Sequence, residues 1–93
     1  QSYLKLFPNP VAQGGVATVA LDLPDGVDVG PVELVVQDVM GRMVRTVKME
    51  RVGTSVQATF SPFSPPSPLA PGTYLLHLTS NGTWLAGGKL LVE

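Results

Sequence analysis

Hydrophobic and polar residues alternate along several stretches of the chain, with the period of two that is typical of β-strands with one buried face. The alternation is clearest in residues 17–23, 32–37, 55–60 and 73–79. No stretch shows the period of 3.6 that an amphipathic helix requires. The apolar positions of these stretches predict a core made of Val19, Leu21, Leu34, Val36, Phe60, Tyr74, Leu76 and Leu78.

Residues with a strong turn preference separate these stretches. Proline donates no backbone hydrogen bond, whereas glycine and asparagine tolerate the positive φ angles of tight turns. Asp38-Val39-Met40-Gly41 predicts a type I turn followed by a G1 bulge, with residues 42–49 as the returning strand. Further turns are predicted at Pro8-Asn9-Pro10, Gln13-Gly14-Gly15, Pro24-Asp25-Gly26, Pro71-Gly72 and Asn81-Gly82.

The returning strand 42–49 has no clear buried face, because Met43 and Val47 lie on one side of it and Val44 on the other. It also carries three of the six basic residues of the chain, which predict a solvated hairpin arm. These residues are Arg42, Arg45 and Lys48.

Two further strands and one loop complete the prediction. Residues 3–7 form a short apolar opening strand. Residues 83–92 form the last strand, in which Gly87-Gly88 predicts a bulge or a break. Residues 61–68 contain four prolines, so we expect an extended surface loop with polyproline character.

About seven strands joined by short turns predict an all-β fold. We expect a seven-stranded antiparallel immunoglobulin-like β-sandwich, with a closed barrel as the alternative. A length of 93 residues fits one domain. We therefore expect residues 1–93 to be a single domain. Because the chain starts at Gln1 without Met, we expect this domain to be cut from the C-terminal end of a longer protein.

Composition excludes several classes of protein. Hydrophobic residues make up 44% of the chain and charged residues 14%, a balance that a disordered segment does not have. The net charge of −1 creates no field that would attract nucleic acid. The absence of cysteine excludes thiol chemistry and cysteine-based zinc sites. No apolar run approaches the ~20 residues of a transmembrane helix, so we predict no membrane insertion.

Candidate catalytic chemistry is sparse. His77 is the only histidine, and it lies on the strand face opposite Tyr74 and Leu76, so we expect an exposed sheet residue rather than a member of a Ser-His-Asp triad. The chain contains no Gly-x-Ser-x-Gly segment that would position a nucleophile. We predict no catalytic site, no cofactor and no enzymatic activity.

Two candidate ligand sites have plainer interpretations. Asp22, Asp25 and Asp28 offer oxygen ligands for calcium, but their spacing does not match an EF-hand loop, and a polar turn is favoured. Trp84 is either a platform that stacks on sugars or a residue packed near a sheet edge. Packing is favoured because aromatic residues make up only 6% of the chain. We therefore predict no metal site.

Four short motifs occur in order along the chain. They are Leu6-Phe7-Pro8-Asn9-Pro10, Val36-Gln37-Asp38-Val39-Met40-Gly41-Arg42-Met43-Val44, Leu69-Ala70-Pro71-Gly72-Thr73-Tyr74-Leu75-Leu76 and Lys89-Leu90-Leu91-Val92. Together they make the whole chain resemble the type A C-terminal sorting domain of the type IX secretion system, the Por secretion tail family. Phe7 and Gln37 stand where that family often has tyrosine, and Glu93 stands where it commonly ends on a basic residue.

The resemblance implies a role in protein transport in Bacteroidetes-type bacteria. Such domains end cargo proteins that enter the periplasm by an N-terminal signal peptide. The folded domain is recognised by the type IX translocon and an outer-membrane shuttle protein. A sortase then cleaves the domain off and usually links the cargo to an anionic lipopolysaccharide. The implied locations are the periplasm in transit, and then the outer membrane surface or the extracellular space.

We expect two groups of residues to serve this role. The residues predicted to contact a partner are Lys89, Leu90, Leu91, Val92, Asp38, Gly41 and Arg42. The final segment, residues 89–92, would add as an edge strand to a partner sheet. For Asp38, Gly41 and Arg42, the alternative is that they only stabilise the hairpin. The residues predicted to be critical for the fold are Pro8, Asn9, Pro10, Pro71, Gly72 and Tyr74.

Two other functions stay open at this point. One is a carbohydrate-binding or adhesion module of a secreted enzyme, which would use Trp84. The other is a passive domain that spaces or stabilises its neighbour. Exposed edge strands in a sandwich also allow a homodimer.

Overall fold

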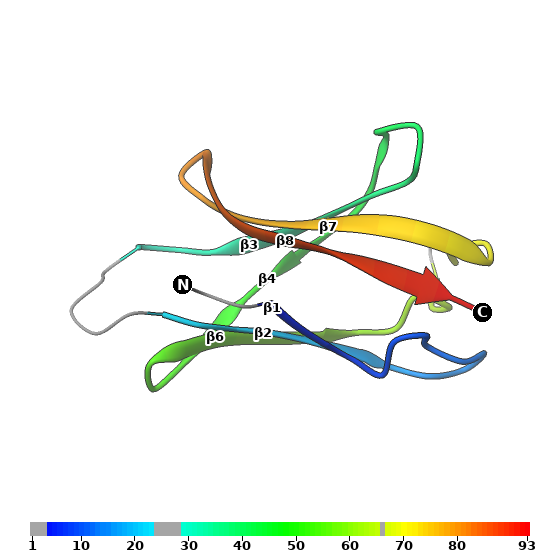
Figure 1. Cartoon of the computed structure of the whole chain (residues 1–93), viewed down its shortest axis with the longest axis horizontal. Helices are drawn as coiled ribbons and strands as arrows, with labels where there is room; N and C mark the ends of the chain where they lie inside the picture. Colours follow the sequence, from blue (N-terminus) through cyan, green and yellow to red (C-terminus); the bar gives the residue numbers. More distant parts are fainter. Residues whose placement is uncertain (1–3, 24–28, 66) are drawn as a thin grey trace.

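The computed structural model of the protein describes residues 4–23, 29–65 and 67–93 (Figure 1). These residues form eight β-strands, which are β1 (Leu4–Phe7), β2 (Ala17–Asp22), β3 (Glu33–Gln37), β4 (Met43–Lys48), β5 (Glu50–Val52), β6 (Ser55–Phe60), β7 (Gly72–Ser80) and β8 (Thr83–Val92). Across the described residues, there is no helix with the length and apolar character that crossing a membrane would need.

The strands form two antiparallel sheets that face each other (Figure 1). One sheet has the strand order β1-β2-β6-β5, and the other has the order β4-β3-β7-β8. The chain changes sheets after β2, β4 and β6, which is the distribution found in immunoglobulin-like sandwiches. Among the described residues no strand of one sheet pairs with a strand of the other, and neither sheet closes on itself, so the sandwich is confirmed and the closed barrel is excluded.

The predicted number of seven strands is wrong by one. β4 ends at Lys48, and the buried Met49 then donates its backbone N–H to the carbonyl of Val32 at 3.0 Å. Beyond this bend, β5 crosses to the opposite sheet and pairs with β6. β5 has three residues, all exposed, and so it lacks the alternation by which the other strands were predicted.

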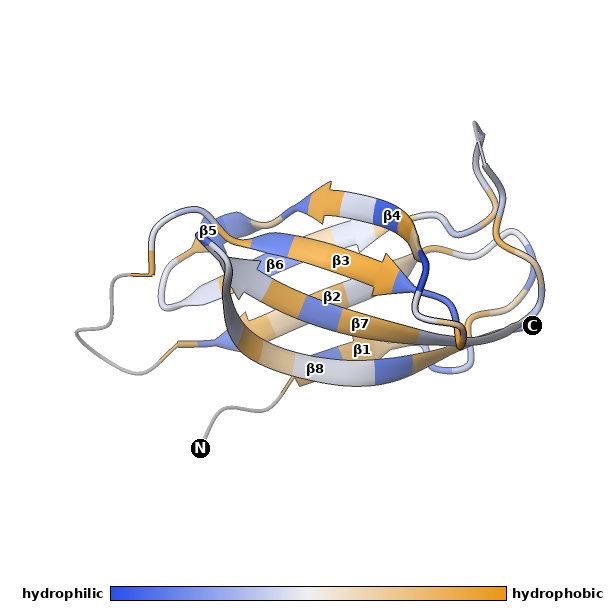
Figure 2. Cartoon of the chain, turned by 90° about the horizontal axis from the view of Figure 1, so that it is seen from above, coloured by the Kyte–Doolittle hydropathy of each residue, from blue (hydrophilic) through white to orange (hydrophobic). Residues whose placement is uncertain are grey.

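The core lies between the sheets, where the inward-facing residues of both layers meet. All eight predicted core residues are buried, each 7% exposed or less. The exposure of successive side chains alternates along β3 and β7, as a strand with one buried face requires. In Figure 2 the middle of β3 is apolar and its two ends are polar. The C-terminal strand adds Leu90 and Val92 to this core, and the loop after β1 adds Val11.

A bulge in β4 explains why the sequence of this strand shows no clear buried face. Val36 pairs with Arg45 and Gln37 pairs with Met43, so Val44 has no partner of its own on β3. A bulge lets two consecutive side chains of a strand point to the same side. Val44 and Val47 consequently both pack against the core although three positions separate them. Arg45 also turns toward the space between the sheets.

Gly87 and Gly88 do not form a bulge or a break, and that prediction is wrong. β8 is continuous, and its irregularity lies at Leu85, between the pairs Leu78–Ala86 and Thr79–Trp84. The two glycines instead make room for other side chains. A Cβ on Gly88 would lie 3.0 Å from Leu6 and 3.2 Å from Leu4, and one on Gly87 would lie 3.3 Å from the indole of Trp84.

The proline-rich segment is more closely packed than an extended surface loop. Its first residues form a turn in which Ser64 N–H donates to the Ser61 carbonyl at 3.3 Å. Pro62 is fully buried, and its carbonyl accepts a 2.7 Å hydrogen bond from the N–H of the buried Leu69. The prediction is therefore wrong for Pro62. Pro66 lies outside the described residues.

Candidate recognition surface

The four motifs of the sequence gather at one end of the sandwich, where the C-terminus lies (Figure 1). β1 and β3 end there, β7 begins there, and Gly72 at the start of β7 pairs with Val92 near the end of β8. The loops 8–16, 38–42 and 61–71 follow or precede these strand ends. We name this end, with residues 7–13, 37–45, 61–74 (except Pro66) and 89–93, the motif end.

The β3–β4 hairpin is held by the side chain of Asp38. Its Oδ1 accepts hydrogen bonds from the backbone N–H groups of Met40 and Arg42, each at 2.9 Å, and its Oδ2 accepts one from Arg42 Nε at 2.7 Å. Gly41 N–H donates to the Asp38 carbonyl at 2.9 Å, and Gly41 has a φ of 84°. These contacts confirm the predicted turn, because only glycine adopts this φ readily.

Electrostatics reinforces this turn. The hydrogen bond from the backbone N–H of Arg42 lowers the pKa of Asp38 below its ordinary value of 3.8, against a smaller opposing effect of desolvation. The Arg42 side chain and the N–H of Met40 lower the pKa further. The Asp38 carboxylate is therefore held in place by these hydrogen bonds, and in its charged form it stabilises the hairpin.

The tip of the hairpin is apolar and exposed. Val39 is 69% exposed, Met40 77% and Met43 64%. Large apolar side chains with this exposure on a rigid turn are typical of contact surfaces. Arg42 stands beside them with its side chain 78% exposed.

Tyr74 anchors the third motif in the way that a tyrosine corner does in immunoglobulin-like domains. Its ring is buried at the start of β7, and its hydroxyl donates to the Ala70 carbonyl at 2.6 Å. Pro71 and Gly72 form the bend between these two residues, and Gly72 has a φ of 149°. That Pro71, Gly72 and Tyr74 are critical for the fold stays a prediction.

The second and third motifs form the two walls of one groove of about 400 Å³. The hairpin contributes one wall and residues 67–70 the other, with Tyr74 between them. Arg45 ties the two walls together, because its guanidinium donates to the carbonyls of Ser61 and Ser67 at 2.8 and 2.9 Å. The sequence predicted Arg45 as part of a solvated arm, and that is wrong, since the residue is half-buried with its guanidinium 5.9 Å from the Phe60 ring centre.

The first motif, residues 6–10, is hydrogen-bonded to the fourth motif, residues 89–92. The side chain of Asn9 donates to the Lys89 carbonyl at 2.8 Å and accepts from the Leu91 N–H at 3.0 Å. Val11 continues the contact, as its N–H donates to the Leu91 carbonyl at 2.9 Å and its carbonyl accepts from the Glu93 N–H at 3.0 Å. Pro8 and Pro10, both preceded by cis peptide bonds, flank Asn9 in this loop.

The C-terminal segment consequently has two kinds of residue. Leu90 and Val92 are enclosed in the core, at 0% and 1% exposure, whereas Lys89 and Leu91 point outward. The backbone edge of this segment is already hydrogen-bonded to residues 9–13 of the same chain. An added partner strand would have to displace those residues first.

The outer face of β7 carries a chain of three polar side chains. Trp84 Nε1 donates to His77 Nδ1 at 3.3 Å, and His77 Nε2 lies 3.1 Å from Gln37 Oε1. His77 is on the face opposite Tyr74, as predicted. Trp84 is 60% exposed, so the prediction that it is packed is wrong, although its ring lies against Gly87.

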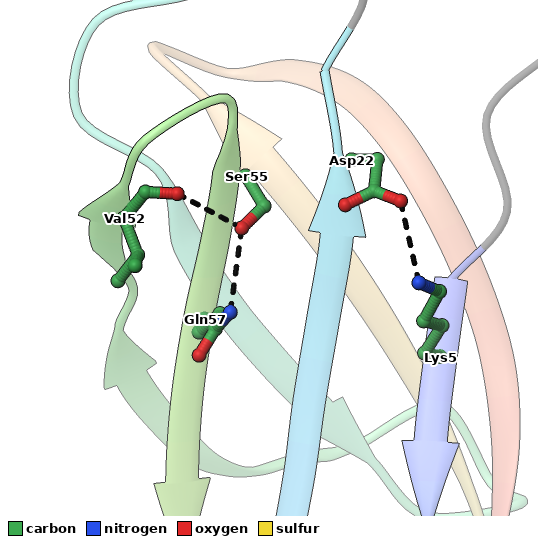
Figure 3. A network of polar contacts seen from close by, with 5 residues as sticks. All are labelled: Lys5, Asp22, Val52, Ser55 and Gln57. Atoms are coloured by element: carbon green, nitrogen blue, oxygen red, sulfur yellow. Dashed lines mark hydrogen bonds and ion pairs between the residues drawn. The ribbon is translucent and has the colours of Figure 1, made fainter.

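The outer face of the other sheet carries ordinary surface contacts. Figure 3 shows Lys5 next to Asp22, and their Nζ and Oδ2 atoms are 3.3 Å apart. The hydroxyl of the buried Ser55 donates to the Val52 carbonyl and accepts from the Gln57 side chain (Figure 3). The described residues contain no group of three or more ligating side chains that could hold a metal ion. The other two aspartates of the calcium candidate, Asp25 and Asp28, lie outside the described residues.

This architecture is that of an immunoglobulin-like β-sandwich domain. Solved structures of larger proteins contain a part with a similar fold. A mutant thermostable endoglucanase from Alicyclobacillus acidocaldarius matches 97% of this chain over 14% of its own length, with a TM-score of 0.66 and 13% identity. The alkylpurine DNA glycosylase AlkC of Pseudomonas fluorescens, bound to DNA containing an abasic site analog, matches 98% over 29% of its length, with a TM-score of 0.71 and 13% identity. At this identity the likeness concerns the fold alone. No curated protein matches the sequence.

The family model named Por_Secre_tail, described as a secretion system C-terminal sorting domain, matches residues 5–93, and the chain belongs to this family. It is a C-terminal sorting signal for type IX secretion. The family is one of sorting signals, not of catalytic domains. Such a signal implies an interaction with the type IX machinery and export toward the cell surface or the extracellular space.

Proposed function

We propose that this chain, as the single C-terminal domain of a larger secreted protein, directs that protein from the periplasm through the type IX translocon and across the outer membrane. An outer-membrane shuttle protein and a sortase are its further partners, and the sortase cleaves the domain off after export. The chain acts throughout as a recognised surface and as a substrate.

The observation that supports this proposal is the gathering of all four motifs at the motif end. Segments as distant as Asn9 and Lys89 are in direct contact there, 80 positions apart in the sequence. A signal recognised as a folded shape needs such a surface, with loops held by a rigid scaffold. The sheets and the tyrosine corner provide that scaffold.

Burial divides the predicted contact residues by role. Arg42, Lys89 and Leu91 are exposed and are the side chains available to a partner. Asp38 and Gly41 set the shape of the hairpin. The partner contacts predicted for Leu90 and Val92 would require the C-terminal strand to leave the core, so we assign their side chains to the stability of the signal.

The test is export of a reporter. Residues 1–93 are fused behind a periplasm-directed fluorescent protein in a bacterium with a type IX system, and surface and medium fluorescence are measured. Deleting residues 89–93 would remove Leu90 and Val92 from the core and unfold the domain. The informative variant is therefore the double substitution Lys89→Ala and Leu91→Ala, which touches only exposed side chains.

The matched control is Lys48→Ala with Val52→Ala, which also removes one exposed lysine and one exposed apolar side chain, on β4 and β5. We expect export of the wild type and of this control, and retention of the Lys89/Leu91 variant in the periplasm. Retention of a folded wild-type fusion would contradict the sorting function and favour a binding or spacer domain.

A carbohydrate-binding or adhesion function is the second candidate, and the exposed indole of Trp84 favours it. Its ring lies next to Gly87 and is exposed to solvent, so it is accessible to a sugar ring. A glycan array with the wild type and Trp84→Ala tests this function. Binding that the variant loses would support it, and an array without binding would exclude it for the glycans presented.

A further inference from the structure

We infer that the groove between the β3–β4 hairpin and residues 67–70 binds an extended, carboxylate-bearing peptide segment of the secretion machinery. This inference rests on the proposed function and goes beyond it by naming the docking site and the chemistry of its occupant. Three observations carry it, namely the unused donors of Arg42, the charge balance of the groove and the open edge of β4.

Arg42 offers two donors that point away from the turn. Its Nε is bonded to Asp38, and in the described part of the chain its two terminal nitrogens have no hydrogen-bond partner. The side chain is 78% exposed and lines the groove. A guanidinium with one edge fixed and the other open is arranged to bind a carboxylate through two parallel hydrogen bonds.

The groove favours an anionic ligand. Asp38 is only 15% exposed and both of its oxygens already accept hydrogen bonds, so it neutralises Arg42 without presenting its own charge to a ligand. Arg45 lies beside the groove, because its guanidinium donates to the carbonyl of the groove residue Ser67 as well as to that of Ser61. It takes part in neither of the two ion pairs found among the described residues, so one positive charge next to the groove is not balanced by an acidic side chain.

The shape of the groove fits an extended chain with apolar side chains. Beside its polar groups, the lining of the groove includes the apolar residues Val44, Pro68 and Leu69. A second hollow of about 290 Å³ along Met43–Thr46 shares Met43 and Val44 with the groove and lengthens it along β4. β4 is the last strand of its sheet, and its outer edge has no neighbouring strand among the described residues. A peptide strand can pair with such an edge.

The test uses the reporter fusion with substitutions in the groove. Arg42→Gln removes the charge, Arg42→Lys keeps it without the planar fork, and Ser67→Trp fills the groove from its exposed rim without touching the Asp38 contacts. Lys48→Gln and Thr59→Trp are the matched controls, since both residues are exposed and lie outside the groove. Thermal unfolding of each purified chain identifies the variants that remain folded.

We expect Arg42→Gln and Ser67→Trp to lower surface fluorescence roughly tenfold or more, the loss typical of one charge-assisted contact at an interface. Arg42→Lys should retain part of the export, because a carboxylate still attracts its charge. Both controls should behave as the wild type. If Arg42→Gln does not fold, Ser67→Trp and Arg42→Lys decide the question.

Several outcomes would overturn the inference while leaving the sorting function intact. One is wild-type export by folded Arg42→Gln and Ser67→Trp variants. Another is a strong effect of Ser67→Trp with none of Arg42→Gln, which would exclude a carboxylate. A third is a dimer in sedimentation equilibrium that dissociates in the Ser67→Trp variant, because the occupant would then be a second copy of this chain. Failure of the wild-type fusion to be exported would instead contradict the proposed function itself.

Discussion

Asn9 contacts the C-terminal strand as a neighbouring strand would, because its side-chain amide bonds to both the Lys89 carbonyl and the Leu91 N–H. A backbone residue of an adjacent strand offers the same donor and acceptor to its partner. The kinked Pro8-Asn9-Pro10 loop cannot form a regular ladder, and the asparagine amide takes the place of one. The first turn of the chain thereby secures its last strand.

Replacing Asn9 should therefore destabilise the motif end. Asn9→Ala removes two hydrogen bonds and leaves two backbone groups of β8 to water, so we expect the free energy of unfolding to fall by about 1–3 kcal/mol. Urea denaturation measures this change. Gln13→Ala, which removes a single 3.2 Å bond to the Glu93 carbonyl, is the comparison and should cost less. Equal effects of the two substitutions would contradict the strand-like role of Asn9.

Gly88 should tolerate no branched side chain. A Cβ there would lie 3.0 Å from Leu6 Cδ1, tighter than most such contacts, and the further methyl groups of valine would crowd Leu6 more, so we expect Gly88→Val to cost about 1–3 kcal/mol through overpacking. Adding Leu6→Ala should return part of this loss, since the truncated side chain vacates the space. A double-mutant cycle by thermal unfolding measures the coupling. Additive effects would mean that the two residues do not share this space.

Asp38 should make part of the stability of the domain depend on pH. Its folded-state pKa is lower than its ordinary value of 3.8, so it stabilises the fold fully above that value. This contribution is lost as the pH falls below about 4 toward the folded-state pKa. Asp38→Asn should be less stable at pH 7 and should lose less stability on acidification. Urea midpoints between pH 7 and pH 2 test this, and parallel curves for both proteins would refute it.

Trp84 provides an optical probe of the outer face, since it is the only tryptophan of the chain. His77→Ala removes the acceptor of its indole N–H, so we expect a red-shifted emission and stronger quenching by iodide. Gln37→Ala removes the next partner in the row and should change the emission less. An unchanged spectrum in His77→Ala would show that the indole does not depend on this contact in solution.

Local patterns in the chain were enough to predict the strands whose side chains alternate and the turns whose backbones need special residues. Val19, Leu34 and Leu76 were predicted to be in the core because a period of two leaves little choice of which face is buried. The hairpin at Asp38 followed from local chemistry, since the aspartate and Gly41 act within a few positions of each other. Membership of the sorting-domain family rested on the order of four motifs, and the family match confirms it.

How those local elements contact one another became visible only in the folded domain. Gly87 and Gly88 suggested a bulge, yet their purpose is to make room for Trp84 and for Leu4 and Leu6 from a distant strand. Arg45 looked like a surface residue, but its pairing with the buried Val36 makes it face the space between the sheets, where it bonds to the carbonyls of Ser61 and Ser67. β5 arises from pairing with β6 and has no periodicity of its own. These features depend on contacts between residues that are far apart in the chain, and periodicity and turn preference describe only neighbours.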